Sequence, residues 1–303
     1  MLTPKKGPDY EATERTLEAW VASLRGRSPH TARSYRDAVK RFLRETGKPI
    51  DRLTVEDAMN YTGELSDSGL SRASVAHHIS ALRSFLRHCQ SLGLFTQTPL
   101  DALKRPRVAV TSMNRYLDQD EAKRLVRGAR KVGPQARAAV ALLLGTGLRV
   151  AELAQSQWRH LFRDPQGNLG LLVVGKGNKE RVVAVREDVW SVLVAERERH
   201  GMGSDLSARD KTPLVASRHG SAPTTMTIWR WVRAAAEAAA IDKPLSPHWL
   251  RHSFGTLTAM GGANVFQIQQ AMGHAQITTS QRYVHWARGL DDSAAHKLPI
   301  KVV

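Results

Sequence analysis

Two side chains near the C-terminal end of the sequence could hold a phosphate group. A Ser-Pro pair at 246–247 favours the start of a helix, which places His248 and Arg251 three residues apart on one face of the first turn. The free N–H groups of a helix N-terminus bind anions, and a guanidinium matches two oxygens of a phosphodiester. The segment therefore favours phosphodiester binding, although a single His-x-x-Arg pair is more often part of a surface ion pair.

A tyrosine farther along the chain could act as a nucleophile. Residues 264–272 form a predicted helix that ends at Gly273, and His274 follows directly. The run 278–280 can cap a further helix that contains Tyr283, nine residues after His274. A phenol has a pKa near ~10 and attacks only when nearby cations stabilise its oxyanion. Considered alone, Tyr283 could also be a structural residue, half-buried, with its hydroxyl in a hydrogen bond.

A zinc site is an alternative for the same region, because His248 and His252 lie four residues apart. The acidic residue that acts as the base of a metalloprotease helix is absent, and no third ligand is apparent, so we expect no metal. The single cysteine, Cys89, excludes an intramolecular disulfide and a cysteine-based zinc site. This cysteine usage agrees with a reducing compartment, and we expect Cys89 to be a buried apolar residue.

The charge of the chain points to a polyanionic partner. Its 303 residues carry 45 Lys and Arg against 28 Asp and Glu, a formal net charge of +17. The excess is spread over both halves, with 18 basic and 12 acidic residues in 1–110 and 27 and 16 in 111–303. The net charge excludes an ordinary acidic metabolic enzyme as the default, and the spread over both halves favours contact of each half with a DNA duplex. Solvated helix faces could give the same excess.

Length and hydropathy indicate a globular protein of two domains. At about 150 residues per domain the chain has room for two, and 42% hydrophobic residues support packed cores. No apolar run approaches the ~20 residues of a bilayer-spanning helix, and residues 1–10 lack a signal-peptide core. We therefore expect no membrane partner and a cytoplasmic, nucleoid-associated protein.

The first domain, predicted over residues 1–107, has the pattern of a four- or five-helix bundle with two basic faces. Apolar stripes at helical spacing run through it, and helices are expected to start near Ser28, Thr54 and Ser71. Two of these helices have basic polar faces, which we assign to DNA binding. The candidate residues are Arg33, Arg36, Lys40, Arg72, Arg83 and Arg87.

A linker is predicted over residues 108–114, and the second domain over 115–303. The second domain begins with a helix capped by Asp118, with Glu121 completing a capping box. Residues 171–174 and 181–185 are two β-branched strands around a Gly/Asn turn, which predicts a β-hairpin with lysines at its tip. The predicted fold class is thus mainly α with a small β-hairpin or sheet.

Five segments occur in a fixed order, and together they are far more specific than any one alone. They are the run 146–153 with Arg149, the hairpin with Lys176, His248 with Arg251, Gly273 with His274, and Tyr283. With this set the sequence resembles the tyrosine recombinases of the phage integrase family, and its pattern is similar to that of bacterial Xer-type site-specific recombinases. The resemblance covers nearly the whole chain and implies a SAM-like helical core-binding domain followed by a mixed α+β catalytic domain. It departs at the end, where residues 288–290 interrupt the final helix and 297–300 resemble an extended tail.

The resemblance implies a role for each residue of the set. Tyr283 would attack a backbone phosphorus, leaving a 3′-phosphotyrosine and a free 5′-hydroxyl without ATP, metal or other cofactor. Arg149 and Arg251 would neutralise the non-bridging oxygens. His274 would donate a further hydrogen bond to the phosphate, Lys176 would protonate the 5′ oxygen, and His248 would accept or relay the tyrosine proton. Glu152 would orient Arg149, and Lys179 and Arg181 would bind backbone phosphates. Glu152 also fits a surface carboxylate beside an arginine.

The resemblance further implies an assembly. The enzyme would act as a homotetramer, or with a related recombinase, on paired DNA sites through a Holliday junction. Chromosome or plasmid dimer resolution and mobile-element integration or excision are the expected roles. Two alternatives remain: a type IB topoisomerase-like nicking and rejoining enzyme, and an architectural DNA-binding protein without catalysis. The separate helical domain favours a recombinase over the former, and the complete catalytic set argues against the latter.

Overall fold

The computed structural model describes residues 8–24, 29–94, 103, 106, 115–175, 179–274 and 276–288. The chain divides into two compact units, Met1–Val110 and Thr111–Val303. The predicted linker over residues 108–114 and the C-terminal tail lie outside the described residues. Within the described ranges no helix is long and apolar enough to cross a membrane.

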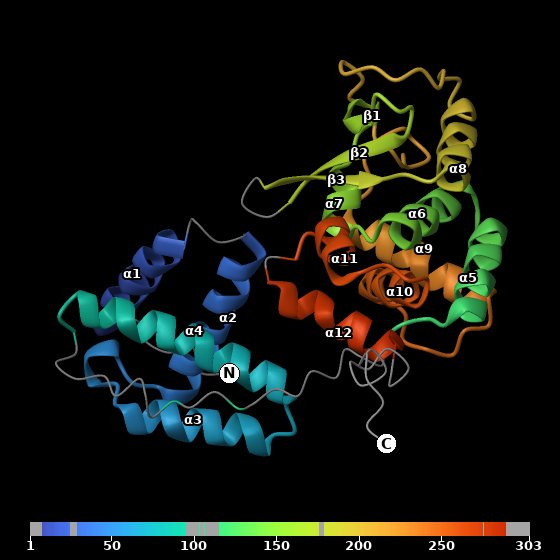
Figure 1. Cartoon of the computed structure of the whole chain (residues 1–303). Coiled ribbons are helices and arrows are strands. Elements are labelled where there is room, and N and C mark those ends of the chain that lie inside the picture. Colours follow the sequence, from blue (N-terminus) through green and yellow to red (C-terminus); the bar gives the residue numbers. More distant parts are fainter. Residues whose placement is uncertain are drawn as a thin grey trace, which may run out of the picture. The chain divides into compact units, whose positions relative to one another are not determined.

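The first unit is a helical bundle (Figure 1). Its helices are α1 (Pro8–Ser23), α2 (Pro29–Thr46), α3 (Val55–Asp67) and α4 (Arg72–Ser91), with a short 3-10 turn η2 (Ile50–Arg52) between α2 and α3. Side-chain caps fix two of the helix starts, because Thr54 and Asp57 form a capping box and Ser71 accepts from the N–H of Ser74.

Aromatic side chains fill the core of this bundle. Trp20, Phe42 and Phe85 are each at most 1% exposed, and the Trp20 and Phe85 rings meet edge to face at 5.3 Å. Cys89 lies in the same core, and its burial raises the pKa of the thiol to about 12. Its predicted place as a small buried apolar residue is therefore confirmed.

The second unit combines a three-stranded antiparallel sheet with the remaining helices. The sheet order is β1 (Leu161–Arg163), β2 (Leu169–Val174) and β3 (Glu180–Ala184). The helices are α5 (Gln119–Val132), α6 (Pro134–Thr146), α7 (Val150–Gln155), α8 (Glu187–Glu198), α9 (Thr225–Ala238), α10 (Pro247–Met260), α11 (Val265–Met272) and α12 (Ile277–Arg288), with a 3-10 turn η4 (Trp158–His160) before the sheet. The expected fold class, mainly helical with a small sheet, is confirmed.

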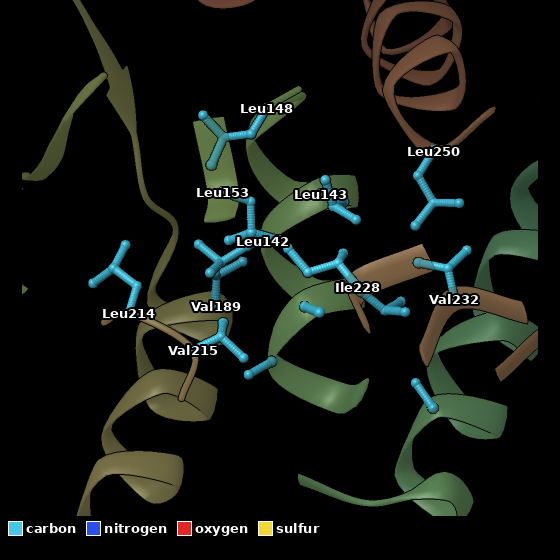
Figure 2. Close-up of a cluster of buried hydrophobic side chains, with 14 of the residues drawn as sticks. Leu142, Leu143, Leu148, Leu153, Val189, Leu214, Val215, Ile228, Val232 and Leu250 are labelled. Atoms are coloured by element: carbon cyan, nitrogen blue, oxygen red, sulfur yellow. The ribbon is translucent and has the colours of Figure 1, made fainter. Parts of the chain in front are cut away.

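The hydrophobic core of this unit surrounds α6, whose sequence is apolar on nearly every side. Figure 2 shows Leu142 and Leu143 between Val189 of α8, Ile228 of α9 and Leu250 of α10. All five side chains are at most 5% exposed. This packing fixes the α6 end from which the chain continues to Arg149.

Two left-handed glycines end helices next to the candidate site. Gly147 ends α6 with φ 65°, and a Cβ there would lie 2.4 Å from the Phe254 ring. Gly273 ends α11 with φ 62°, and a Cβ there would lie 2.9 Å from the side chain of Arg181. Both positions combine a positive φ with a close approach, so only glycine fits without strain.

Candidate active site

Arg149 lies in the turn between α6 and α7. Its backbone N–H donates to Glu152 Oε2 at 2.7 Å, and its guanidinium Nη1 donates to Glu152 Oε1 at 2.8 Å. Nη2 points to the carbonyl of Gly273 at 3.5 Å. The side chain keeps 40% of its surface exposed. Arg149 is therefore held on one side by Glu152 and open on the other.

Glu152 is a buried carboxylate that joins two arginines. Its side chain is 5% exposed, and Arg181 binds both of its oxygens, at 2.9 and 2.8 Å. Burial alone would raise the pKa of Glu152, but the hydrogen bonds from Arg181 and from the Arg149 backbone outweigh it and lower the pKa to about 2. Glu152 is therefore ionised, and its contacts match the predicted orientation of Arg149 rather than a surface carboxylate.

Arg181, for which phosphate binding is predicted, makes hydrogen bonds inside the protein. All three guanidinium nitrogens donate inside the protein, two to Glu152 and Nε to the carbonyl of Ala271 at 2.9 Å. Its side chain is 10% exposed. These contacts form an internal bridge from β3 to α7 and α11, while the phosphate binding of Arg181 stays a prediction. No local sequence signal distinguishes the two roles.

Among the cations of the site that the structure describes, Arg251 is the most buried, with 4% of the residue exposed. Its Nη1 donates to the Gly147 carbonyl at 2.6 Å, and its Nη2 donates to the Met272 carbonyl. Burial, together with the nearby charge of Arg149, lowers the pKa of Arg251 to about 10. The guanidinium therefore stays charged at neutral pH. Arg149 and Arg251 reach the neighbouring carbonyls of Gly273 and Met272, which places the two guanidinium groups at the same turn.

Tyr283, on α12, lies among histidines. Its hydroxyl is hydrogen-bonded to His252 Nδ1 at 2.7 Å, and its ring stacks on that of His274 with centroids 6.1 Å apart. Gly255 allows this approach of α12 to α10, because a Cβ there would lie 3.0 Å from the tyrosine ring. The spacing of His252 from His248 points only to a zinc ligand, so sequence reasoning does not find the contact of His252 with Tyr283.

The other two histidines of the set differ in environment. His274 Nδ1 is hydrogen-bonded at 2.8 Å to Ser280, which is fully buried, so Nε2 is the nitrogen left to face a ligand. Burial, with Arg251 and Arg149 nearby, lowers the pKa of His274 to about 4. His248 is exposed, and the centroid of its ring lies 6.0 Å from the centroid of the His252 ring.

Lys176, the predicted acid on the hairpin, lies outside the described residues, and Lys179 beside it is exposed. The basic residues predicted to bind DNA in the first unit lie on two helices. Arg33, Arg36 and Lys40 are on α2, and Arg72, Arg83 and Arg87 are on α4. All are exposed except Arg83, which is half-buried.

The arrangement suits attack on a phosphodiester. Two guanidinium groups lie at one turn, and a phenol and an imidazole share a hydrogen bond beside them. Among the described residues no three His, Cys, Asp or Glu side chains converge to hold a metal ion, so the zinc interpretation of His248 and His252 gains no third ligand there.

Both units of the chain match known proteins in sequence, and the chain matches known structures in fold. The model of the phage integrase family matches residues 115–289, and that of the phage integrase N-terminal SAM-like domain matches 17–90. The chain is 30% identical over 298 residues to tyrosine recombinase XerD of Chlorobaculum tepidum, covering 93% of this chain and 94% of that protein. It is 31% identical over 291 residues to XerD of Pseudomonas putida, covering 92% and 94%. A lambda integrase tetramer bound to a Holliday junction shares the fold, with a TM-score of 0.72 and 20% identity over 91% of this chain and 78% of that one.

Proposed function

Because this chain belongs to the phage integrase family and is a tyrosine recombinase that transfers DNA strands, we propose that Tyr283 is its nucleophile. The phenol oxygen attacks a backbone phosphorus, the P–O5′ bond breaks, and a 3′-phosphotyrosine and a free 5′-hydroxyl result. The phosphotyrosine keeps the energy of the broken bond, so rejoining needs no ATP. This proposal rests on one observation: the Tyr283 hydroxyl lies 2.7 Å from Nδ1 of His252, near the buried Arg251 and the half-buried Arg149.

Arg149 and Arg251 stabilise the charge that develops on the non-bridging oxygens. Each guanidinium is fixed in advance, Arg149 by Glu152 and Arg251 by the carbonyls of Gly147 and Met272. Donors held in place before the reaction need no reorganisation in the transition state, and this usually supplies a large part of the rate enhancement. The Nε2 of His274 adds a further hydrogen bond, since Ser280 occupies the other ring nitrogen.

Proton transfer completes the reaction. Lys176 protonates the departing 5′ oxygen from the β2–β3 hairpin, an assignment that rests on the sequence. His248, with its exposed ring, relays the tyrosine proton toward solvent. Because the tyrosine gives up one proton and the 5′ oxygen takes up another, cleavage leaves the charge of the phosphodiester unchanged. No step of this reaction requires a metal.

The DNA partner is a specific duplex site. The basic faces of α2 and α4 and the exposed Lys179 bind its backbone. Strand exchange between two duplexes needs four active sites, and the lambda integrase tetramer on a Holliday junction supports the same assembly for this chain. We therefore assign it a tetrameric complex on paired sites, formed alone or with a related recombinase. Dimer resolution and mobile-element integration or excision are both compatible with this activity.

One experiment separates a recombinase from a type IB topoisomerase-like enzyme. The site is first selected from a pool of random duplexes by binding. Supercoiled plasmids with no, one or two copies of the site are then incubated with the protein. We expect deletion or inversion within a single plasmid only for the plasmid with two copies. Equal relaxation of all three plasmids without recombinants would favour the topoisomerase-like activity and contradict the proposal.

A further inference from the structure

His252 contacts the reacting atom of the proposed nucleophile. The residue directly follows Arg251 on α10, and its Nδ1 lies 2.7 Å from the hydroxyl oxygen of Tyr283 on α12. The two ring centroids are 5.9 Å apart, with the planes inclined by 46°. The hydrogen bond thus runs between ring edges, as required for proton transfer, and the rings do not stack face to face.

The surroundings of His252 favour its neutral form. Burial, followed by the neighbouring His248, Arg251 and Arg115, lowers the pKa of His252 to about 4. Tyr283 faces it from α12, and His274 lies on the other side of the tyrosine ring. A neutral imidazole with its proton on Nε2 has a free lone pair on Nδ1, where it can accept from a phenol.

Building on the assignment of Tyr283 as the nucleophile, we propose that His252 is the general base of the cleavage step. As the phenol oxygen bonds to phosphorus, its proton moves to Nδ1 of His252, and the P–O5′ bond breaks with a proton supplied to the 5′ oxygen by the general acid. In rejoining, the 5′-hydroxyl gives its proton back to the conjugate base of the general acid as its oxygen attacks phosphorus, and the His252 imidazolium returns its proton to the departing phenolate oxygen. His248 then acts only as an exchange route from the His252 ring, 6.0 Å away.

A general base and a mere hydrogen-bonding residue respond differently to substitution. In His252→Asn the amide side chain can replace Nδ1 in a hydrogen bond to Tyr283, but it cannot take up a proton. In His252→Ala both functions are lost and a space opens that added imidazole can enter. His219→Asn, an exposed histidine on a loop, is the matched control.

The test is single-turnover cleavage of a nicked duplex at pH values from about 6 to about 9. A positioned base contributes roughly 100-fold or more, so we expect His252→Asn to cleave at least ~100-fold more slowly near neutral pH. Its rate should rise with pH because hydroxide replaces the base, whereas the wild-type rate should depend little on His252 ionisation over this range. Imidazole should restore cleavage to His252→Ala in proportion to its free-base concentration.

Two further observations separate this inference from the proposed function. DNA binding and thermal unfolding of each variant verify that it folds, and Tyr283→Phe tests the nucleophile itself. Loss of the covalent adduct in Tyr283→Phe, together with wild-type rate and pH dependence in His252→Asn, would overturn the role of His252 and leave the nucleophile in place. A covalent adduct that persists in Tyr283→Phe would overturn both. Absence of imidazole rescue in a folded, DNA-binding His252→Ala would also count against the base.

Discussion

The guanidinium of Arg181 binds the carboxylate of Glu152 through two parallel hydrogen bonds of 2.9 and 2.8 Å. This contact ties β3 to α7, the helix that begins directly after Arg149. The same carboxylate also accepts from Arg149, so one ionised group orients a proposed catalytic arginine and anchors the hairpin. Loss of its charge should therefore affect both stability and catalysis.

Glu152→Gln should reduce the free energy of unfolding by about 3 kcal/mol at neutral pH. The folded-state pKa is lowered from 4.5 to about 2, so the stabilisation is fully present above about pH 4.5. It is lost as the pH falls through about 2, where the wild-type carboxylate also becomes neutral. Denaturant unfolding at several pH values measures the difference, with the exposed Glu198→Gln as control. A difference that stayed constant from pH 7 to pH 2 would argue against this ion pair as its source.

Arg181→Ala and Lys179→Ala should have opposite signatures. Arg181 is committed to Glu152 and Ala271, so its removal leaves a buried carboxylate with fewer partners and should cost about 3 kcal/mol of stability. Lys179 is exposed, so its removal should weaken DNA binding and leave the unfolding midpoint unchanged. Thermal unfolding and DNA affinity, measured on both variants, distinguish the two roles. Normal stability in Arg181→Ala combined with weak DNA binding would instead support phosphate binding by Arg181.

Lys176→Ala should slow cleavage of an ordinary phosphodiester and be largely rescued when sulfur replaces the 5′ bridging oxygen. A thiolate leaves without a proton and so does not need the general acid. The ratio of single-turnover rates on the two substrates is the measurement, with Lys179→Ala as the matched lysine variant. An equal loss of rate on both substrates would mean that Lys176 only positions DNA, and Lys179 would become the candidate acid.

Affinity for the DNA site should depend strongly on salt, and the basic faces of the first unit should contribute to that dependence. Each lost phosphate contact lowers the slope of log affinity against log salt by roughly 0.9. We expect this change for Arg72→Gln and for Arg87→Gln. Lys48→Gln is a charge-matched control, because its ammonium group is paired with Asp57 at 2.7 Å. Slopes identical to the wild type in both arginine variants would identify the α4 face as ordinary solvated surface.

Local sequence signals predicted much of this structure. The box formed by Asp118 and Glu121 is present, with hydrogen bonds of 3.0 and 2.8 Å in the two directions. The β-branched runs form β2 and β3 in antiparallel register, with Leu172 opposite Val182. These features depend on residues within one turn or one hairpin, so nearby sequence determines them. The short strand β1 was not predicted, since three residues carry too little periodicity.

Contacts between residues far apart in the chain could not be predicted from the sequence. Arg181 and Lys179 look alike as basic residues of one hairpin, and only the packing of β3 against α7 and α11 separates their roles. His252 and Tyr283 are 31 residues apart, and their hydrogen bond depends on how closely α12 approaches Gly255 of α10. The order of motifs suggested which residues belong to one site, but it could not give their partners.

The nucleophile is tested most directly by covalent capture of a nicked duplex by wild-type protein, Tyr283→Phe and Tyr116→Phe. Tyr116 is a half-buried tyrosine of the same unit and is the matched control. We predict a DNA-linked protein band for the wild type and for Tyr116→Phe, with the nucleotide mapped by mass spectrometry to the peptide that contains Tyr283. Tyr283→Phe should bind the duplex with nearly unchanged affinity, because it loses no positive charge, and form no adduct. An adduct of normal yield in Tyr283→Phe, or one mapped to another residue, would contradict the account.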